Sequence, residues 1–182
     1  MKKAIGLVEW KAIGLGIVGT DAMVKSSPVE LIQATTVCPG KYVALVAGNV
    51  GAVENAVKNG VAAYPEGVIG QLVLPNVHPD VFPALAGATE PKSDRGALGI
   101  IETFSVAPAI RAGDAAAKGA LINLLEIRLA RGMGGKSLVL LQGEVGAVRT
   151  AVERGREAVE EGMLVAGVVI PSVDPALLRE VL

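Results

Sequence analysis

The chain has 182 residues, and its charges nearly cancel, with 17 Lys and Arg against 18 Asp and Glu. Hydrophobic residues make up 51% of it, which excludes intrinsic disorder, because a disordered chain needs low hydrophobicity and high net charge. A near-neutral chain also lacks the excess of Lys and Arg that neutralises nucleic-acid phosphates. We therefore expect a folded protein of one domain or two small ones, with no nucleic-acid partner.

The sequence predicts a cytosolic protein without a membrane partner. No apolar run reaches the roughly 18 residues of a membrane-spanning helix. The basic start is followed by only five uncharged residues before Glu9, too few for the core of an export signal. Cys38 is the single cysteine, so an intrachain disulfide is excluded. One cysteine and one histidine, His78, are too few ligands for an ordinary structural metal site within one chain.

An internal repeat divides the chain. The segment AIGLVE, ending at Glu9, returns as ALGIIE, ending at Glu102. Three further blocks recur in the same order: Asp21–Lys25 as Asp114–Lys118, Gly48–Val53 as Gly143–Val148, and Leu74–Pro79 as Ile170–Pro175. Four blocks in register predict two similar domains, residues 1–91 and 92–182, joined near the polar segment 90–95.

Each half predicts the same order of elements. An aliphatic strand comes first, and a helix of small residues follows at 13–26 and 106–118, with Ser105 as the expected N-cap of the second copy. The next strand alternates in the second copy. Its expected inner side chains are Leu125, Ile127 and Leu129, and its expected outer side chains are Glu126 and Arg128.

A glycine turn then leads into a buried apolar strand, at 43–47 or 138–141. A second helix with a valine stripe and a last strand ending at Pro75 or Pro171 complete each half. The order β-α-β-β-α-β predicts an α+β fold, a mostly antiparallel sheet with helices on one side.

As a set, these blocks resemble the bacterial microcompartment (BMC) shell-protein family. The opening A-[IL]-G-[LI]-[VI]-E, the helix end D-A-x-x-K and the helix start G-x-V-G-A-V each occur twice, and they cover nearly the whole chain. Two BMC domains in one chain are similar to the tandem shell proteins, which form trimers that imitate a hexamer. The resemblance implies a non-enzymatic, homotrimeric facet tile of a microcompartment shell, assembled with other BMC shell proteins.

The turn Cys38-Pro39-Gly40-Lys41 further resembles the iron–sulfur shell proteins of propanediol-utilisation compartments. In these, cysteines from three chains meet at the central pore. The resemblance implies that Cys38 of each of three chains binds one [4Fe–4S] cluster, and that Pro39, Gly40 and Lys41 line the pore. From the second domain, the implied pore loop contains Gly132, Met133, Gly134 and Gly135. The implied role is electron transfer across the shell to an enclosed or docked redox enzyme.

Two observations from the residues bear on this interpretation. The equivalent stretch of the second repeat has no cysteine, so the fold does not require one there. Lys41 and the turn amides would favour the Cys38 thiolate and stabilise bound sulfide. Three alternatives stay open: a buried structural cysteine, a tile without a cluster whose pore passes small metabolites, and an enzyme or sensor on a duplicated scaffold. Against the last, the sequence offers no nucleophile–base pair, and its glycine loop lacks the P-loop pattern.

Each of the remaining candidate residues has a structural explanation, and the two lysines also have a functional one. Lys25 and Lys118 end their helices, where the dipole favours a cation. In the family, the matching lysine lies at the subunit edge and tiles one hexagon against the next. His78 is expected to be structural. Glu9 and Glu102 occupy equivalent points of two domains, so repetition explains their presence.

Overall fold

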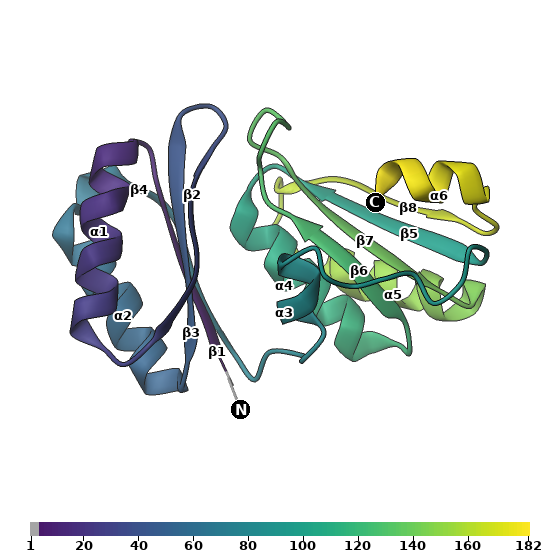
Figure 1. Cartoon of the computed structure of the whole chain (residues 1–182), viewed down its shortest axis with the longest axis horizontal. Coiled ribbons are helices and arrows are strands. Elements are labelled where there is room, and N and C mark those ends of the chain that lie inside the picture. Colours follow the sequence, from purple (N-terminus) through teal and green to yellow (C-terminus); the bar gives the residue numbers. More distant parts are fainter. Residues whose placement is uncertain (1–3) are drawn as a thin grey trace. The chain divides into compact units, whose positions relative to one another are not determined.

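The computed structural model describes residues 4–182, which form two compact units that meet in sequence between Val77 and His78 (Figure 1). The first unit contains β1 (Ala4–Trp10), α1 (Ile13–Ser26), β2 (Glu30–Val37), β3 (Lys41–Gly48), α2 (Val50–Ala63) and β4 (Val68–Pro75), with a short 3₁₀ turn at Pro65–Gly67. The second contains α3 (Val81–Leu85), β5 (Ala97–Thr103), α4 (Val106–Gly119), β6 (Asn123–Arg128), β7 (Ser137–Gly143), α5 (Val145–Glu157), β8 (Leu164–Ile170) and α6 (Pro175–Val181).

The two sheets have the same topology. The strand order is β2-β3-β1-β4 in the first and β6-β7-β5-β8 in the second, and every neighbouring pair is antiparallel. Within each sheet the strand that begins the repeat is central and lies between the third and fourth strands. The expected α+β architecture and the tandem duplication are therefore confirmed.

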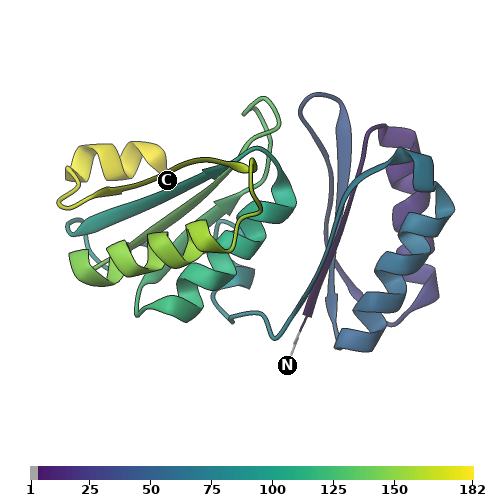
Figure 2. The ribbon, with the colours of Figure 1, turned by 180° about the vertical axis from the view of Figure 1, so that it is seen from behind.

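Small residues let the helices approach the first sheet closely. Both α1 and α2 cover one face of it (Figure 2). A Cβ on Gly6 of β1 would lie 2.7 Å from side-chain atoms of Val53 and Val57 in α2. A Cβ on Gly19 of α1 would lie 2.3 Å from the ring of Trp10, which is fully buried. Because real Cβ contacts are never that short, glycine is required at both close approaches.

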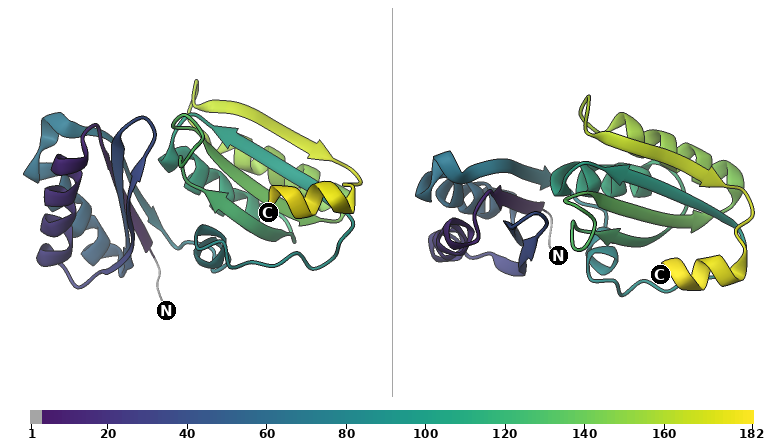
Figure 3. Two further views of the ribbon diagram at one scale, coloured as in Figure 1. Left: turned by 45° about the horizontal axis from the view of Figure 1, so that its top comes forward. Right: turned by 90° about the horizontal axis from the view of Figure 1, so that it is seen from above.

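The second unit is covered on both faces. Its α4 and α5 lie on one face of the sheet, and α6 lies across the other (Figure 3). A separate apolar cluster joins α6 to the sheet through Leu98, Leu125, Leu140, Val173 and Leu178. The expectation of helices on one side therefore holds for the first unit but not for the second, because α6 was not predicted.

The predicted alternation in β6 is wrong. The pairing of β6 with β7 shifts register between Leu124 and Glu126, as at a β-bulge. Leu125 consequently joins the apolar cluster under α6. Ile127 lies on the opposite side, where it approaches Gly113 of α4. The extra residue explains why Leu125 and Ile127 do not share a face.

The polar segment between the repeats is fastened to the second unit. The Asn123 side-chain amide donates to the Glu90 carbonyl at 2.9 Å, and that of Gln142 donates to the Ser93 carbonyl at 2.9 Å. In addition, α3 packs against β6 and α4. The compact units therefore divide at 77/78, earlier than the 91/92 boundary expected from the sequence.

The expected N-cap of α4 is confirmed in position but not in its hydrogen bond. Ser105 occupies the N-cap position of α4, but its side chain makes no capping bond; its carbonyl instead accepts from the Thr103 hydroxyl at 2.8 Å.

Between residues 4 and 182, none of the helices has the length and apolar character needed to span a membrane.

Candidate functional site

Cys38 lies at the turn between β2 and β3. The turn is closed by the Gly40 N–H, which donates to the Val37 carbonyl at 3.1 Å. Gly40 has φ +83°, in the left-handed region that glycine adopts without strain. The Cys38 thiol is free and its residue is partly exposed. The alternative of a fully buried structural cysteine therefore does not hold within this chain.

Lys41 is engaged at the base of the same hairpin. Its ammonium group donates to the carboxylate of Glu9, the residue before the end of β1. The side chains are only 17% and 3% exposed, so the pair is largely withdrawn from water. The cation expected to assist the Cys38 thiolate is thus already balanced by a buried carboxylate.

The second unit repeats this ion pair in a more open setting. Lys136 Nζ lies 2.7 Å from Glu102 Oε1, and the two side chains are 43% and 30% exposed. The pairing gives Glu9 and Glu102 a structural role that the sequence analysis missed. A signal was present, because the glutamate and the lysine that begins or precedes the third strand recur together in both repeats.

The predicted pore loop of the second unit lies between β6 and β7. Gly132, Gly134 and Gly135 have φ values of +70°, +62° and +92°. The Lys136 N–H donates to the Met133 carbonyl at 3.1 Å, which closes the turn. These conformations support the interpretation of a tight hairpin that depends on glycine.

The predicted edge lysines both form ion pairs one helical turn apart. Lys25 Nζ lies 2.6 Å from Asp21 Oδ2 at the end of α1, and Lys118 Nζ lies 2.6 Å from Asp114 Oδ2 at the end of α4. Their surroundings differ: the Asp21 side chain is 55% exposed and that of Asp114 only 6%.

His78 has the structural role expected of it. Its backbone N–H donates to Asp114 Oδ1 at 2.7 Å, and its ring Nδ1 accepts from the Asp80 N–H at 3.3 Å. Over residues 4–182, no group of three or more His, Cys, Asp or Glu side chains is placed to hold a metal ion. A metal centre at Cys38 would therefore need ligands from outside this chain.

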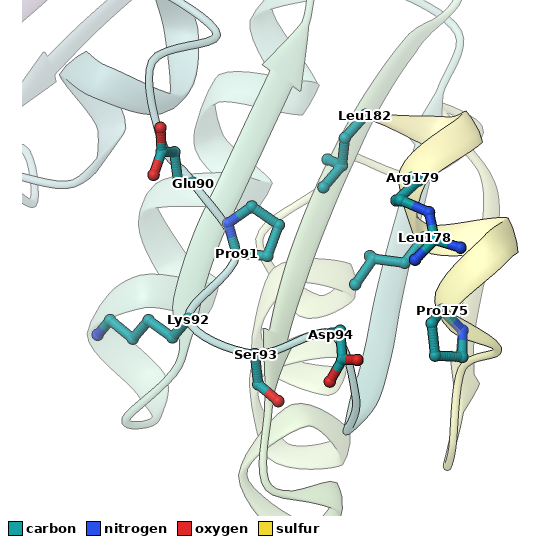
Figure 4. Close-up of a pocket in the computed structure, with 9 residues that line it drawn as sticks. All are labelled: Glu90, Pro91, Lys92, Ser93, Asp94, Pro175, Leu178, Arg179 and Leu182. Carbon is teal, nitrogen blue, oxygen red and sulfur yellow. The ribbon is translucent and has the colours of Figure 1, made fainter.

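A cavity of about 330 Å³ opens in the second unit between the linker and α6 (Figure 4). Leu178 and Leu182 border it on the α6 side, and Pro91 borders it on the linker side. The charged groups of Glu90 and Lys92 point away from α6. The polar groups do not converge in the cavity, so it gives no support to an enzyme active site there.

Comparison with known proteins agrees with the duplicated fold. The family model described as "BMC domain" matches residues 4–77 and again 97–173. The chain belongs to the family of BMC-domain shell proteins. It carries the domain twice, in tandem.

Full-length relatives share the tandem arrangement. The chain is 39% identical to the bacterial microcompartment shell protein PduT of Citrobacter freundii, over 99% of this chain and 98% of the relative. A crystal structure of a microcompartment protein from Desulfitobacterium hafniense DCB is 47% identical, with a TM-score of 0.92 over 98% of this chain and 99% of that one.

Other relatives match in part or in fold alone. The carboxysome shell protein CsoS1A of Hydrogenovibrio crunogenus is 40% identical over 48% of this chain and 97% of its own length. The fused permuted hexameric shell protein MSM0275 from the RMM microcompartment has a TM-score of 0.59 at 21% identity, covering 86% of this chain and 81% of its own, which shows similarity of fold.

Proposed function

We propose that the protein is a facet tile of a microcompartment shell in which three copies close into a ring of six BMC domains. The observation that carries the proposal is the unequal exposure of equivalent positions. Ile110 in α4 and Leu124 in β6 are fully buried in the second unit, where α3 packs against both elements. Their counterparts on α1 and β2, Ile17 and Leu31, are 54% and 43% exposed.

A second copy of the chain is the natural cover for that exposed surface. Exposed apolar groups cost free energy in water, and the same surface of the duplicated domain is buried in the other unit. Contacts of one copy's second unit with the next copy's first unit are head-to-tail, and such contacts form a closed ring when the rotation allows it. Light scattering at micromolar concentration should give the mass of a trimer; a stable monomer would contradict the proposal.

We further propose that Cys38 from the three copies holds one [4Fe–4S] cluster at the centre of the ring. The residue supports this in three ways: it is the only cysteine, its thiol is free, and it lies partly exposed at a hairpin turn. One thiolate per chain becomes three in a trimer, and a cluster is commonly held by four ligands, so the remaining iron site would take a non-protein ligand. A cluster held there supplies one-electron chemistry.

Two contacts within the chain would hold Cys38 in position at this site. The closed turn at Gly40 fixes the backbone beside Cys38, and the Lys41–Glu9 pair fastens the start of β3 to β1. The resulting function is electron transfer across the shell, between the surrounding solution and an enclosed or docked redox enzyme. The resemblance to PduT, which is itself a microcompartment shell protein, supports the assignment to a shell.

The test is anaerobic reconstitution of the purified protein with iron and sulfide. Wild-type protein should gain a brown chromophore and about four irons per trimer. Cys38→Ser should lose both, because serine is a poor ligand for cluster iron, while the trimer persists. Thr36→Ala, on the exposed end of the same hairpin, is the matched control and should retain the iron. Wild-type protein that binds no iron would instead favour a tile whose open pore passes small metabolites.

At the outer edge, we propose that Lys25 and Lys118 make the contacts that join one tile to the next or to other BMC shell proteins. Both lysines end a helix and remain partly exposed, at 74% and 42% of the side chain. Each is held near a carboxylate on its own helix, so each presents its remaining ammonium protons outward in a defined position.

A further inference from the structure

Asp114 is a buried carboxylate with two separate donors. Its Oδ2 accepts from Lys118 Nζ at 2.6 Å, and its Oδ1 accepts from the backbone N–H of His78 at 2.7 Å. Its side chain is 6% exposed, so neither oxygen can rely on bulk water. The segment that begins at His78 thereby docks on the end of α4 through a charge-assisted hydrogen bond, which is stronger than a neutral one.

Asp21 occupies the equivalent position in the first repeat but has only one of these donors. Its Oδ2 accepts from Lys25 Nζ at 2.6 Å, as in the second unit. Its Oδ1 has no partner among residues 4–182, and its side chain is 55% exposed. The ion pair is thus repeated in full, whereas the docking bond is present in one repeat and absent from the other.

The matching donor exists at the other end of the chain. Val173-Asp174-Pro175 follows β8 as Val77-His78-Pro79 follows β4. The Asp174 carboxylate is occupied within its own chain, where it accepts from the Ala176 N–H at 2.8 Å. The backbone N–H of Asp174 has no partner in the described part of the chain. Because the donor is a backbone group, the change from histidine to aspartate leaves it intact.

We infer that Asp21 Oδ1 accepts the backbone N–H of Asp174 from a second copy of this chain. The contact rests on the proposed trimer and assigns a residue pair to its interface, which neither copy completes alone. Asp21 lies one helical turn after the exposed Ile17 on α1, whose counterpart Ile110 is buried in the second unit, so one surface supplies both an apolar and a polar complement. Three such bonds would fasten the ring, each the equivalent of the His78–Asp114 bond.

The experiment measures subunit exchange between differently tagged trimers, mixed at equal concentration and separated at intervals. Asp21→Ala should accelerate exchange about tenfold or more, because a hydrogen bond to a charged group is lost at each junction. Asp21→Asn keeps an uncharged acceptor oxygen and should give an intermediate rate. Asp21 is exposed, so both variants should fold, which circular dichroism and the fluorescence of the buried Trp10 will verify.

Two further variants separate the explanations. Glu54→Ala removes an exposed carboxylate of α2 in the same unit and should exchange at the wild-type rate. Lys25→Met removes the ion pair but leaves the Asp21 acceptor, so it should not reproduce the Asp21→Ala effect. Asp21→Ala trimers that exchange at the wild-type rate, or Lys25→Met trimers that exchange as fast as those of Asp21→Ala, would overturn the inference and leave the trimer standing. A monomeric wild-type protein would instead overturn the proposed ring itself.

Discussion

Replacing Lys41 by methionine should destabilise the first unit strongly. The substitution keeps most of the side-chain volume but leaves the Glu9 carboxylate, 3% exposed, without its counter-ion. Removing one partner of a buried ion pair typically costs 3–5 kcal/mol. Since the Lys41 side chain retains 17% exposure, we expect the lower end, about 3 kcal/mol.

The second repeat supplies a matched control. Lys136 makes the same pair with Glu102, but the two side chains are 43% and 30% exposed. Water can replace the lost partner there, and exposed pairs contribute about 0.2–1 kcal/mol. Lys136→Met should therefore cost no more than about 1 kcal/mol. The double variant Glu9→Gln/Lys41→Met should regain much of the loss, because it buries no uncompensated charge.

Urea denaturation at one fixed protein concentration provides the assay, because any association shifts apparent stability. Trp10 is the single tryptophan, is fully buried and neighbours Glu9 in β1, so its fluorescence reports on the first unit. Hydrogen exchange followed by mass spectrometry reports on β5 and β7 of the second. Equal losses for Lys41→Met and Lys136→Met would refute the argument that burial, rather than the pairing itself, determines the cost.

Two further predictions concern the lysines proposed to lie at the tile edge and the packing of α6 on the sheet of the second unit. Lys25→Glu and Lys118→Glu should each leave the trimer intact but abolish ordered layers in electron micrographs, and layers from both variants would show that the edge assignment is wrong. Leu178→Ala should destabilise the second unit by about 2–4 kcal/mol, because Leu178 is the buried residue of α6 that packs on the sheet and is only 2% exposed. Faster hydrogen exchange in β5 and β7 would register that loss, and unchanged protection would mean that α6 contributes little.

The duplication, the order of strands along the chain and the two main helices of each unit could be predicted from the sequence, because repeated blocks and long apolar periods are strong signals. The short helices α3 and α6 could not. A helix of five or seven residues has little periodicity of its own, and tertiary packing decides whether it forms. The bulge at Leu125 was missed for a related reason, since one extra residue reverses the faces of a strand without leaving a mark in its composition.

The sequence locates the turn at Cys38, but it does not show which charges lie beside it. The turn at Cys38 was placed correctly between two strands, because proline and glycine mark it locally. The partner of Lys41 was not found, because Glu9 lies far away in sequence and meets it only through the pairing of β1 with β3. Repetition alone does not explain Glu9, because a repeated acid and a repeated base together indicate a repeated contact.

Duplication also changes how often a residue occurs around the proposed ring. In a ring of six identical domains, a cysteine at this turn would appear six times. In the tandem chain Cys38 belongs to the first repeat alone, and the second repeat carries a glycine-rich loop in its place. In the proposed ring, three copies would bring three thiols to the axis, which would leave room for a cluster with one further ligand. Divergence between two copies of one domain would thus give the proposed ring a threefold site, which a hexamer of one repeated domain cannot form.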